Sequence, residues 1–330
     1  MLVSALMDSA SVARLLETSA QEWTDTIRDR WLGGGTYSVY DAAVEVYGRS
    51  LLSWAGVETD RRTATRIAQA EAAIVDGFAV LGPAWLRTRV NRRRCDGWFT
   101  EQIRRTRAGE LTPGPHSPLG LVLAHREADG RPLSDHVAAV ELQNAIRPGI
   151  AVCRFAAFAA LALHEHPEWR ERVAAETTAR GDTTHCPTAV AFAEEVRRYY
   201  PFVPLLPAVA RRDLEFEGAE LAQGGRVLLD IYGTNHDERH WRSPEHFDPS
   251  RFLGTGETFA EYFVPQGGGR PETGHRCPGE IITVGLLAQT VAELSRLDAM
   301  VEPEGLEWSL HRMPTAPRDG VLLSRVSRRA

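Results

Sequence analysis

The fold is decided by the stretch Phe263-Val-Pro-Gln-Gly-Gly-Gly-Arg-Pro-Glu-Thr-Gly-His-Arg-Cys277-Pro-Gly-Glu280, a glycine-rich loop that leads directly into an apolar helix. A cysteine just before a helix start lies at the positive end of the helix dipole, where a thiolate is favoured. Pro278 suits the first helical turn, where a missing N–H costs nothing. The glycines let backbone amides approach the sulfur closely. The pattern predicts either a metal-bound thiolate at Cys277 or a structural cysteine on a phosphate-binding loop.

The composition of the chain excludes several kinds of chemistry. The 330 residues are 43% hydrophobic and 25% charged, with a formal net charge of −6. This is an ordinary globular composition, and its charge gives no global field for nucleic acid or acidic membranes. The absence of lysine excludes Schiff-base lysine chemistry and a P-loop. The four cysteines stand singly, so neither a disulfide framework nor a structural zinc site is expected.

No segment of the sequence is typical of a secretory signal or a membrane span. Met1 is not followed by a basic region and an apolar block. The best membrane candidate, residues 149–163, is too short to cross a bilayer and contains Arg154. We therefore expect a buried helix there, and a cytoplasmic protein without a membrane span.

The apolar periodicity predicts a mainly α fold with small β-sheets towards the C-terminus. Helices are expected over residues 11–30, 36–57, 134–167, 188–200 and 280–297. Short strands are expected at residues 214–216 and 227–231 and at the end of the chain. No internal repeat or low-complexity linker divides the sequence, so one unit over residues 1–330 is expected.

Residues 87–107 hold eight arginines, with Trp85, Trp98 and Phe99 nearby. A basic surface with interleaved aromatic side chains is one signature of nucleic-acid binding. The plainer interpretation is an exposed helix–loop–helix surface, and the acidic net charge of the chain favours it. No nucleic-acid partner is therefore expected.

The long helix over residues 134–167 contains Arg147-Pro148-Gly149 near its middle. Pro148 cannot donate a backbone hydrogen bond, and its ring crowds the carbonyl of Asn144. We expect the helix to be kinked or opened at this point. Arg147 alone would most simply be a surface or salt-bridged arginine, whereas a local opening in a buried helix often marks a site.

A second motif precedes the cysteine loop. Glu195 and Arg198 are three residues apart on an expected helix, so they share a face and can form an ion pair. Such pairs are usually solvated and of little consequence. Between this helix and the loop comes Phe247-Asp-Pro-Ser-Arg251-Phe252, which can bring a second arginine onto Glu195.

The order of these three motifs resembles the C-terminal signature of the cytochromes P-450: Glu-x-x-Arg, then Phe-x-Pro-x-Arg-Phe, then a glycine loop that ends in Cys-x-Gly. The resemblance implies a cytochrome P-450 fold with haem b as cofactor and Cys277 as its proximal thiolate ligand. The Glu–Arg–Arg triad of that family, which locks the core behind the haem loop, corresponds to Glu195, Arg198 and Arg251. Loop residues that the resemblance places at the haem are Gln266, Gly268, His275 and Gly279.

Two departures from the general P-450 pattern point to one branch of the family. The haem loop carries extra residues over 266–273, and residues 144–149 lack the acid and alcohol that relay protons to dioxygen. Both departures resemble the bacterial fatty-acid peroxygenases, which use hydrogen peroxide directly. The resemblance covers nearly the whole chain and is densest from Arg147 onwards.

The peroxygenase resemblance assigns roles to residues on the distal side. Arg147, followed by Pro148, would bind the fatty-acid carboxylate in a charge-assisted pair, and that carboxylate would serve as the acid–base group for peroxide cleavage. Oxidation would then fall on the α or β carbon. Phe202, Val203 and Leu205 would line the acyl channel, although ordinary core packing explains them nearly as well. Fatty acid and hydrogen peroxide are the expected partners, without a redox protein.

The resemblance also implies that the chain lacks what the family places before Met1, namely the first strands of the β region and the loop that caps the substrate pocket. Two alternatives to a peroxygenase therefore stay open. One is a reductase-dependent monooxygenase, against which Arg147-Pro148 argues. The other is a truncated protein that binds haem, or fails to bind it, without turnover.

Overall fold

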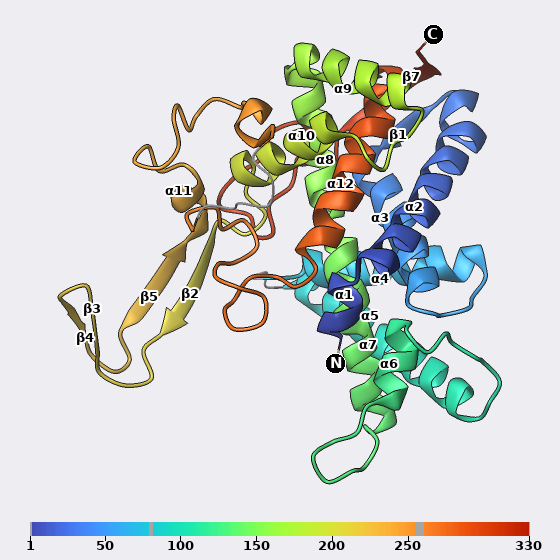
Figure 1. Cartoon of the computed structure of the whole chain (residues 1–330), viewed down its shortest axis with the longest axis vertical. Coiled ribbons are helices and arrows are strands. Elements are labelled where there is room, and N and C mark those ends of the chain that lie inside the picture. Colours follow the sequence, from blue (N-terminus) through green and yellow to red (C-terminus); the bar gives the residue numbers. More distant parts are fainter. Residues whose placement is uncertain (1, 79–81, 255–260, 330) are drawn as a thin grey trace.

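The computed structural model describes residues 2–78, 82–254 and 261–329. A body of packed helices makes up most of the molecule, and a long β-ribbon projects from one side of it (Figure 1). The mainly α fold with small sheets is confirmed. The helices are α1 (Val3–Met7), α2 (Ser9–Asp29), α3 (Val39–Trp54), α4 (Arg61–Asp76), α5 (Pro83–Arg107), α6 (Pro118–Ala124), α7 (Asp135–Ala151), α8 (Cys153–Glu165), α9 (Pro167–Arg180), α10 (Pro187–Tyr199), α11 (Ile231–Asn235) and α12 (Glu280–Ser295), with 3-10 turns at Trp31–Gly33 and Pro249–Phe252.

Short polar side chains begin several of these helices. Asp8, Ser38, Asp60 and Ser134 each accept a hydrogen bond from a backbone N–H in the first turn of α2, α3, α4 and α7. Such N-caps satisfy amide groups that have no partner inside the helix. They fix where α4 and α7 start, and these two helices carry Glu71 and Arg147, which are discussed below.

The sequence-based prediction was wrong in two places. Residues 36–38 form a strand, β1 (Thr36–Ser38), instead of the first turn of a helix, because they pair with β7 near the other end of the chain. The arginine-rich segment is one continuous helix, α5, and not a helix–loop–helix. Its many arginines are compatible with one uninterrupted helix, because arginine has a high helix propensity.

The long helix is interrupted four residues after Pro148, at Val152, where α7 ends and α8 begins. The Val152 N–H bonds to the carbonyl of Gly149, three residues back, in place of the usual i−4 carbonyl. Regular helical bonding resumes when the Ala156 N–H reaches Val152. The predicted opening is therefore present, one turn later than Pro148 itself.

The sheets are small and antiparallel. One has the strand order β1–β7–β6, with β6 (Leu297–Val301) and β7 (Leu322–Arg328) close to the C-terminus. The projecting ribbon pairs β2 (Leu205–Val209) with β5 (Arg226–Asp230), and β3 (Leu214–Phe216) pairs with β4 (Ala219–Leu221) at its tip. β3 and β5 match the predicted strands to within a residue, whereas β2 was not predicted as a strand.

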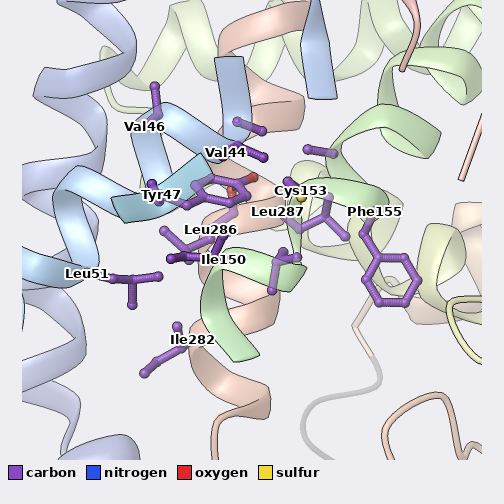
Figure 2. Packing of buried hydrophobic residues seen from close by; sticks show 14 of the residues in the cluster. Val44, Val46, Tyr47, Leu51, Ile150, Cys153, Phe155, Ile282, Leu286 and Leu287 are labelled. Carbon is purple, nitrogen blue, oxygen red and sulfur yellow. Dashed lines mark hydrogen bonds between the residues drawn. The ribbon is translucent and has the colours of Figure 1, made fainter. Parts of the chain in front are cut away.

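The core is built around α3, α7, α8 and α12. Ile150 and Cys153 from the α7/α8 junction lie in the same apolar cluster as Ile282, Leu286 and Leu287 of α12 (Figure 2). The combined span Asp135–Glu165 is long and apolar enough to cross a membrane, but 89% of its most apolar window is buried inside the protein. A core helix of a globular protein passes the same test, and this burial favours that interpretation.

Candidate functional site

The glycine loop folds back on itself just before α12. The Cys277 N–H bonds to the carbonyl of Gln266 at 2.9 Å, and the His275 N–H bonds to that of Gly268 at 3.0 Å. Gly267 lies between these bonds with φ at +94°, and a Cβ there would meet the His275 carbonyl oxygen at 2.0 Å. Only glycine fits this position. These two backbone hydrogen bonds within the loop hold the main chain of Cys277 in place.

The sulfur of Cys277 differs from the other three in its exposure. Cys95, Cys153 and Cys186 are buried, while Cys277 is partly exposed at the start of α12. Burial raises the pKa of the Cys277 thiol, and the backbone N–H of Gly279, which bonds to the sulfur, opposes that shift. Next to the sulfur, a Cβ on Gly279 would come within 3.8 Å of Cys277 Sγ and 3.9 Å of Leu6 in α1. The Cys277 thiol is therefore partly accessible, and its sulfur accepts a hydrogen bond from the backbone.

A chain of ion pairs anchors the start of α12, and sequence reasoning missed it. Arg197 is fully buried and pairs with both Glu194 and Glu280, and Glu280 also pairs with Arg276 beside the cysteine. The Arg197 guanidinium lies 5.4 Å from the ring centroid of Phe263 at the other end of the loop. The signal was available, because Glu194 and Arg197 repeat the i,i+3 spacing of the neighbouring Glu-x-x-Arg motif.

Gln266 joins the loop to α12 and keeps one polar atom without a partner. Its Nε2 donates to Thr283 Oγ1 at 3.0 Å. Its Oε1 is buried and has no hydrogen-bond partner among the described residues. Buried acceptors are nearly always bonded, so this oxygen is an exception within the loop.

The structure brings the three members of the predicted triad together. Arg198 donates to both carboxylate oxygens of Glu195, at 2.7 and 2.8 Å, and both side chains are fully buried. Arg251 lies 3.5 Å from Glu195 Oε1 and donates to the carbonyls of Arg242, Ser243 and His246. The Asp248 N–H also bonds to Glu195 Oε1, at 2.7 Å. The network ties α10 to the segment that precedes the cysteine loop.

Arg147 is largely buried, and two of its guanidinium nitrogens already donate hydrogen bonds. Its side chain is 14% exposed, and Nε donates to Glu71 of α4, which is fully buried. Nη2 donates to Gln143 Oε1 at 2.8 Å. No sequence signal links Glu71 to Arg147, because the two lie on different helices and 76 residues apart. Pro148, next to Arg147, is exposed.

The predicted acyl-channel residues lie after α10, and one of them, Phe202, packs against α8. The ring of Phe202 lies 5.7 Å from that of Phe155 and 5.8 Å from the Arg154 guanidinium. Val203 is half-buried in the same connection, and Leu205 begins β2. Phe202 therefore lies against α8, the continuation of the helix that carries Arg147.

Comparisons with known proteins agree with this geometry. A family model described as cytochrome P450 matches residues 154–284, which include Glu195, Arg198, Arg251 and Cys277. The structure of cytochrome P450EX alpha with myristic acid superposes with a TM-score of 0.86 at 32% identity, over 99% of this chain and 77% of that one. The chain belongs to the cytochrome P450 family.

Two further solved members of the family are similarly close. Ligand-free cytochrome P450 OleT has a TM-score of 0.88 at 31% identity, over 100% of this chain and 77% of its own. Cytochrome P450SP alpha in complex with (R)-ibuprophen has a TM-score of 0.86 at 32% identity, over 99% and 78%. About a quarter of each solved P450 therefore has no counterpart in this chain.

Among curated P450 relatives, the match is shorter. Cytochrome P450 2C3 of Oryctolagus cuniculus is 28% identical over 165 residues, which are 46% of this chain and 33% of that protein. Cytochrome P450 4A10 of Rattus norvegicus is 27% identical over 217 residues, or 62% and 42%. The chain thus spans less than half the length of the curated relatives it matches.

Cytochromes P450 hold haem through a cysteine thiolate, and the residues of this chain fit that group. Cys277 offers a partly exposed sulfur with a backbone N–H on it, at the positive end of a 16-residue helix. Among the residues that the structure describes, no group of three His, Cys, Asp or Glu side chains could hold a bare metal ion. A haem, whose porphyrin supplies four ligands, needs only the one sulfur that this site provides.

Proposed function

We propose that the chain is a haem-thiolate peroxygenase that hydroxylates a fatty acid at the α or β carbon with hydrogen peroxide. One C–H bond of the acid becomes C–OH, the inserted oxygen comes from peroxide, and the second peroxide oxygen leaves as water. Bound haem would supply the centre at which the O–O bond is broken, with Cys277 as the thiolate that favours this cleavage. Arg147 would bind the carboxylate.

The observation that carries the proposal is a largely buried arginine on α7, the helix whose continuation α8 packs against α12, which follows the cysteine. Ile150, one turn after Arg147, and Ile282, five residues after Cys277, are both buried in the core that these helices share (Figure 2). This supports a position for Arg147 above the site of Cys277. A guanidinium there presents parallel N–H donors that match a carboxylate.

The role of Arg147 would be to orient the substrate. Holding the acid end in place puts the first carbons of the chain nearest the oxidising centre, so position is selected by geometry. The bound carboxylate would also supply the acid–base group that residues 144–149 lack. That lack is why a reductase-dependent monooxygenase, which needs protons delivered to dioxygen, is the less favoured function.

The proposal is consistent with what similar proteins bind. Cytochrome P450EX alpha was solved with myristic acid, and a variant of cytochrome P450 OleT was solved with arachidonic acid. The OleT complex matches this chain with a TM-score of 0.89 at 30% identity. Both ligands have the carboxylate that the Arg147 guanidinium would receive.

The test compares wild-type protein with Arg147→Ala, both loaded with haem and supplied with myristic acid and hydrogen peroxide. Wild type should give the 2- or 3-hydroxy acid. The hydroxylation rate of the variant should be about 100-fold lower, because the acid is no longer held in position. Its haem content should stay the same. Since the variant strands Glu71, the double variant Arg147→Ala, Glu71→Gln controls for folding.

Unchanged turnover in the folded variant would contradict the role of Arg147. Haem-loaded wild type without any hydroxylated product would instead favour a haem-binding protein without turnover. Activity that requires NAD(P)H and a redox protein would favour the reductase-dependent reaction.

A further inference from the structure

A buried polar cluster joins α4, α5 and α7 around Glu71. Its carboxylate accepts from Arg147 Nε, and Arg147 Nη2 bonds to Gln143. Gln143 donates in turn to Asp96 Oδ1 at 3.1 Å. The charged and titratable groups that face Glu71 are Arg147 on α7 and Cys95 and Asp96 on α5. The cluster thus centres on one arginine and the carboxylate bound to it.

Glu71 is paired with the Arg147 guanidinium, the group that would bind the substrate carboxylate in the proposed function. A guanidinium paired with a buried carboxylate is electrically neutral, so it attracts a second carboxylate only weakly. Arg147 can therefore receive a fatty acid through the same donors only after Glu71 has lost its charge or moved away.

The bonding of Glu71 is incomplete. Its Oε1 is buried and makes no hydrogen bond among the described residues, although the thiol of Cys95, a weak donor, faces the carboxylate. An unsatisfied buried carboxylate oxygen is costly, more so than a neutral polar group. Burial raises the pKa of Glu71, and the pairing with Arg147 opposes the shift without cancelling it. The free energy needed to protonate Glu71 is therefore lower than that for an exposed glutamate.

We propose that the Glu71 carboxylate and the substrate carboxylate are alternative partners of Arg147, so that Glu71 sets the affinity of the chain for fatty acids. The inference rests on the proposed function. In the exchange, the Arg147–Glu71 ion pair breaks, Glu71 takes up one proton from solvent, and the Arg147–substrate ion pair forms. One proton is bound for each acid that binds.

The sign of the pH dependence follows from this exchange. Above the pKa of Glu71, a proton must be taken up for each acid bound, so the affinity falls about tenfold for each rise of one pH unit. Below that pKa, Glu71 is already neutral, and its protonation no longer makes the affinity for the fatty acid depend on pH. A purely structural Glu71–Arg147 pair would produce no such coupling.

The experiment measures myristic acid binding to haem-loaded protein by calorimetry, in buffers of different ionisation heat and over a range of pH. Wild type should take up one proton per acid. Glu71→Gln should take up none and should bind at least about tenfold more tightly above neutral pH. The matched control is Asp76→Asn, because Asp76 is another α4 carboxylate on a buried arginine, Arg154. That variant should bind like wild type.

The outcomes separate the inference from the proposed function. Loss of binding in Arg147→Ala with unchanged affinity and proton uptake in Glu71→Gln would overturn the inference and leave the function standing. Unchanged binding in Arg147→Ala would contradict the function itself. Equal tightening in Glu71→Gln and Asp76→Asn would also overturn the inference, because the effect would then be one of charge on α4 and not of competition for Arg147.

Discussion

Two buried glutamates in this protein each hold an arginine, and they differ in how completely they are bonded. Glu195 accepts two hydrogen bonds from Arg198 and one from the Asp248 N–H, and Arg251 lies beside it. Glu71 accepts from Arg147 through one oxygen, and beyond that bond only the Cys95 thiol, a weak donor, faces the carboxylate. Both carboxylates are fully buried.

The difference separates a structural ion pair from one that can exchange partners. A buried charge pair is held firmly only when further hydrogen bonds satisfy its remaining lone pairs. Glu195 meets that condition and fixes the segment in front of the cysteine loop. Glu71 does not meet it, and its arginine is the group that the proposed function needs free for substrate. The carboxylate of Glu195 is therefore part of a fixed structural pair, whereas that of Glu71 belongs to a pair that can exchange partners.

The largest effect should follow from Glu195→Gln. The neutral amide leaves Arg198 as a buried charge without a counter-ion, which costs about 3–5 kcal/mol. The urea midpoint of unfolding should fall sharply. The matched variant Glu71→Gln should stay within about 1 kcal/mol of wild type, since it removes an incompletely bonded charge and Arg147 is not fully shielded from water. Equal losses in the two variants would remove the distinction between the two pairs.

A smaller effect should follow from Gly267→Ala in the cysteine loop. The added Cβ would meet the His275 carbonyl oxygen and would sit at a φ of +94°, so the backbone has to move. We expect a loss of about 1–3 kcal/mol and a lower haem content, measured by absorbance per protein. Gly269→Ala is the control, because it has a similar φ of +77° but its Cβ would approach nothing closer than 3.4 Å. Equal haem content in the two variants would contradict this reading of the loop.

The proximal side was predictable because its signals lie close together in the sequence. The spacing of Glu195 and Arg198 indicated their pairing, and Cys277-Pro-Gly-Glu280 indicated the helix that begins at Glu280. Arg251 could be assigned only through the order of family motifs, since its distance from Glu195 depends on the path of the intervening chain. The resemblance thus supplied what local periodicity could not.

The distal side was only half predictable. Pro148 indicated an opening in the long helix, although hydrogen bonding places the break at Val152. Glu71 could not be found, because nothing in its own helix distinguishes it from a surface glutamate. The strand at Thr36–Ser38 was missed for the same reason, since its partner β7 lies near the far end of the chain. Contacts between distant segments leave no local pattern.

The central claim is that Cys277 ligates a haem, and the absorption spectrum of the reduced, carbon-monoxide-bound protein tests it most directly. The protein would be expressed with added haem precursor and compared with Cys277→Ala. We predict a strongly red-shifted Soret band, typical of thiolate-bound haem, in the wild type and its loss in the variant. Haem-loaded wild type without that band, or the same band in Cys277→Ala, would contradict the assignment.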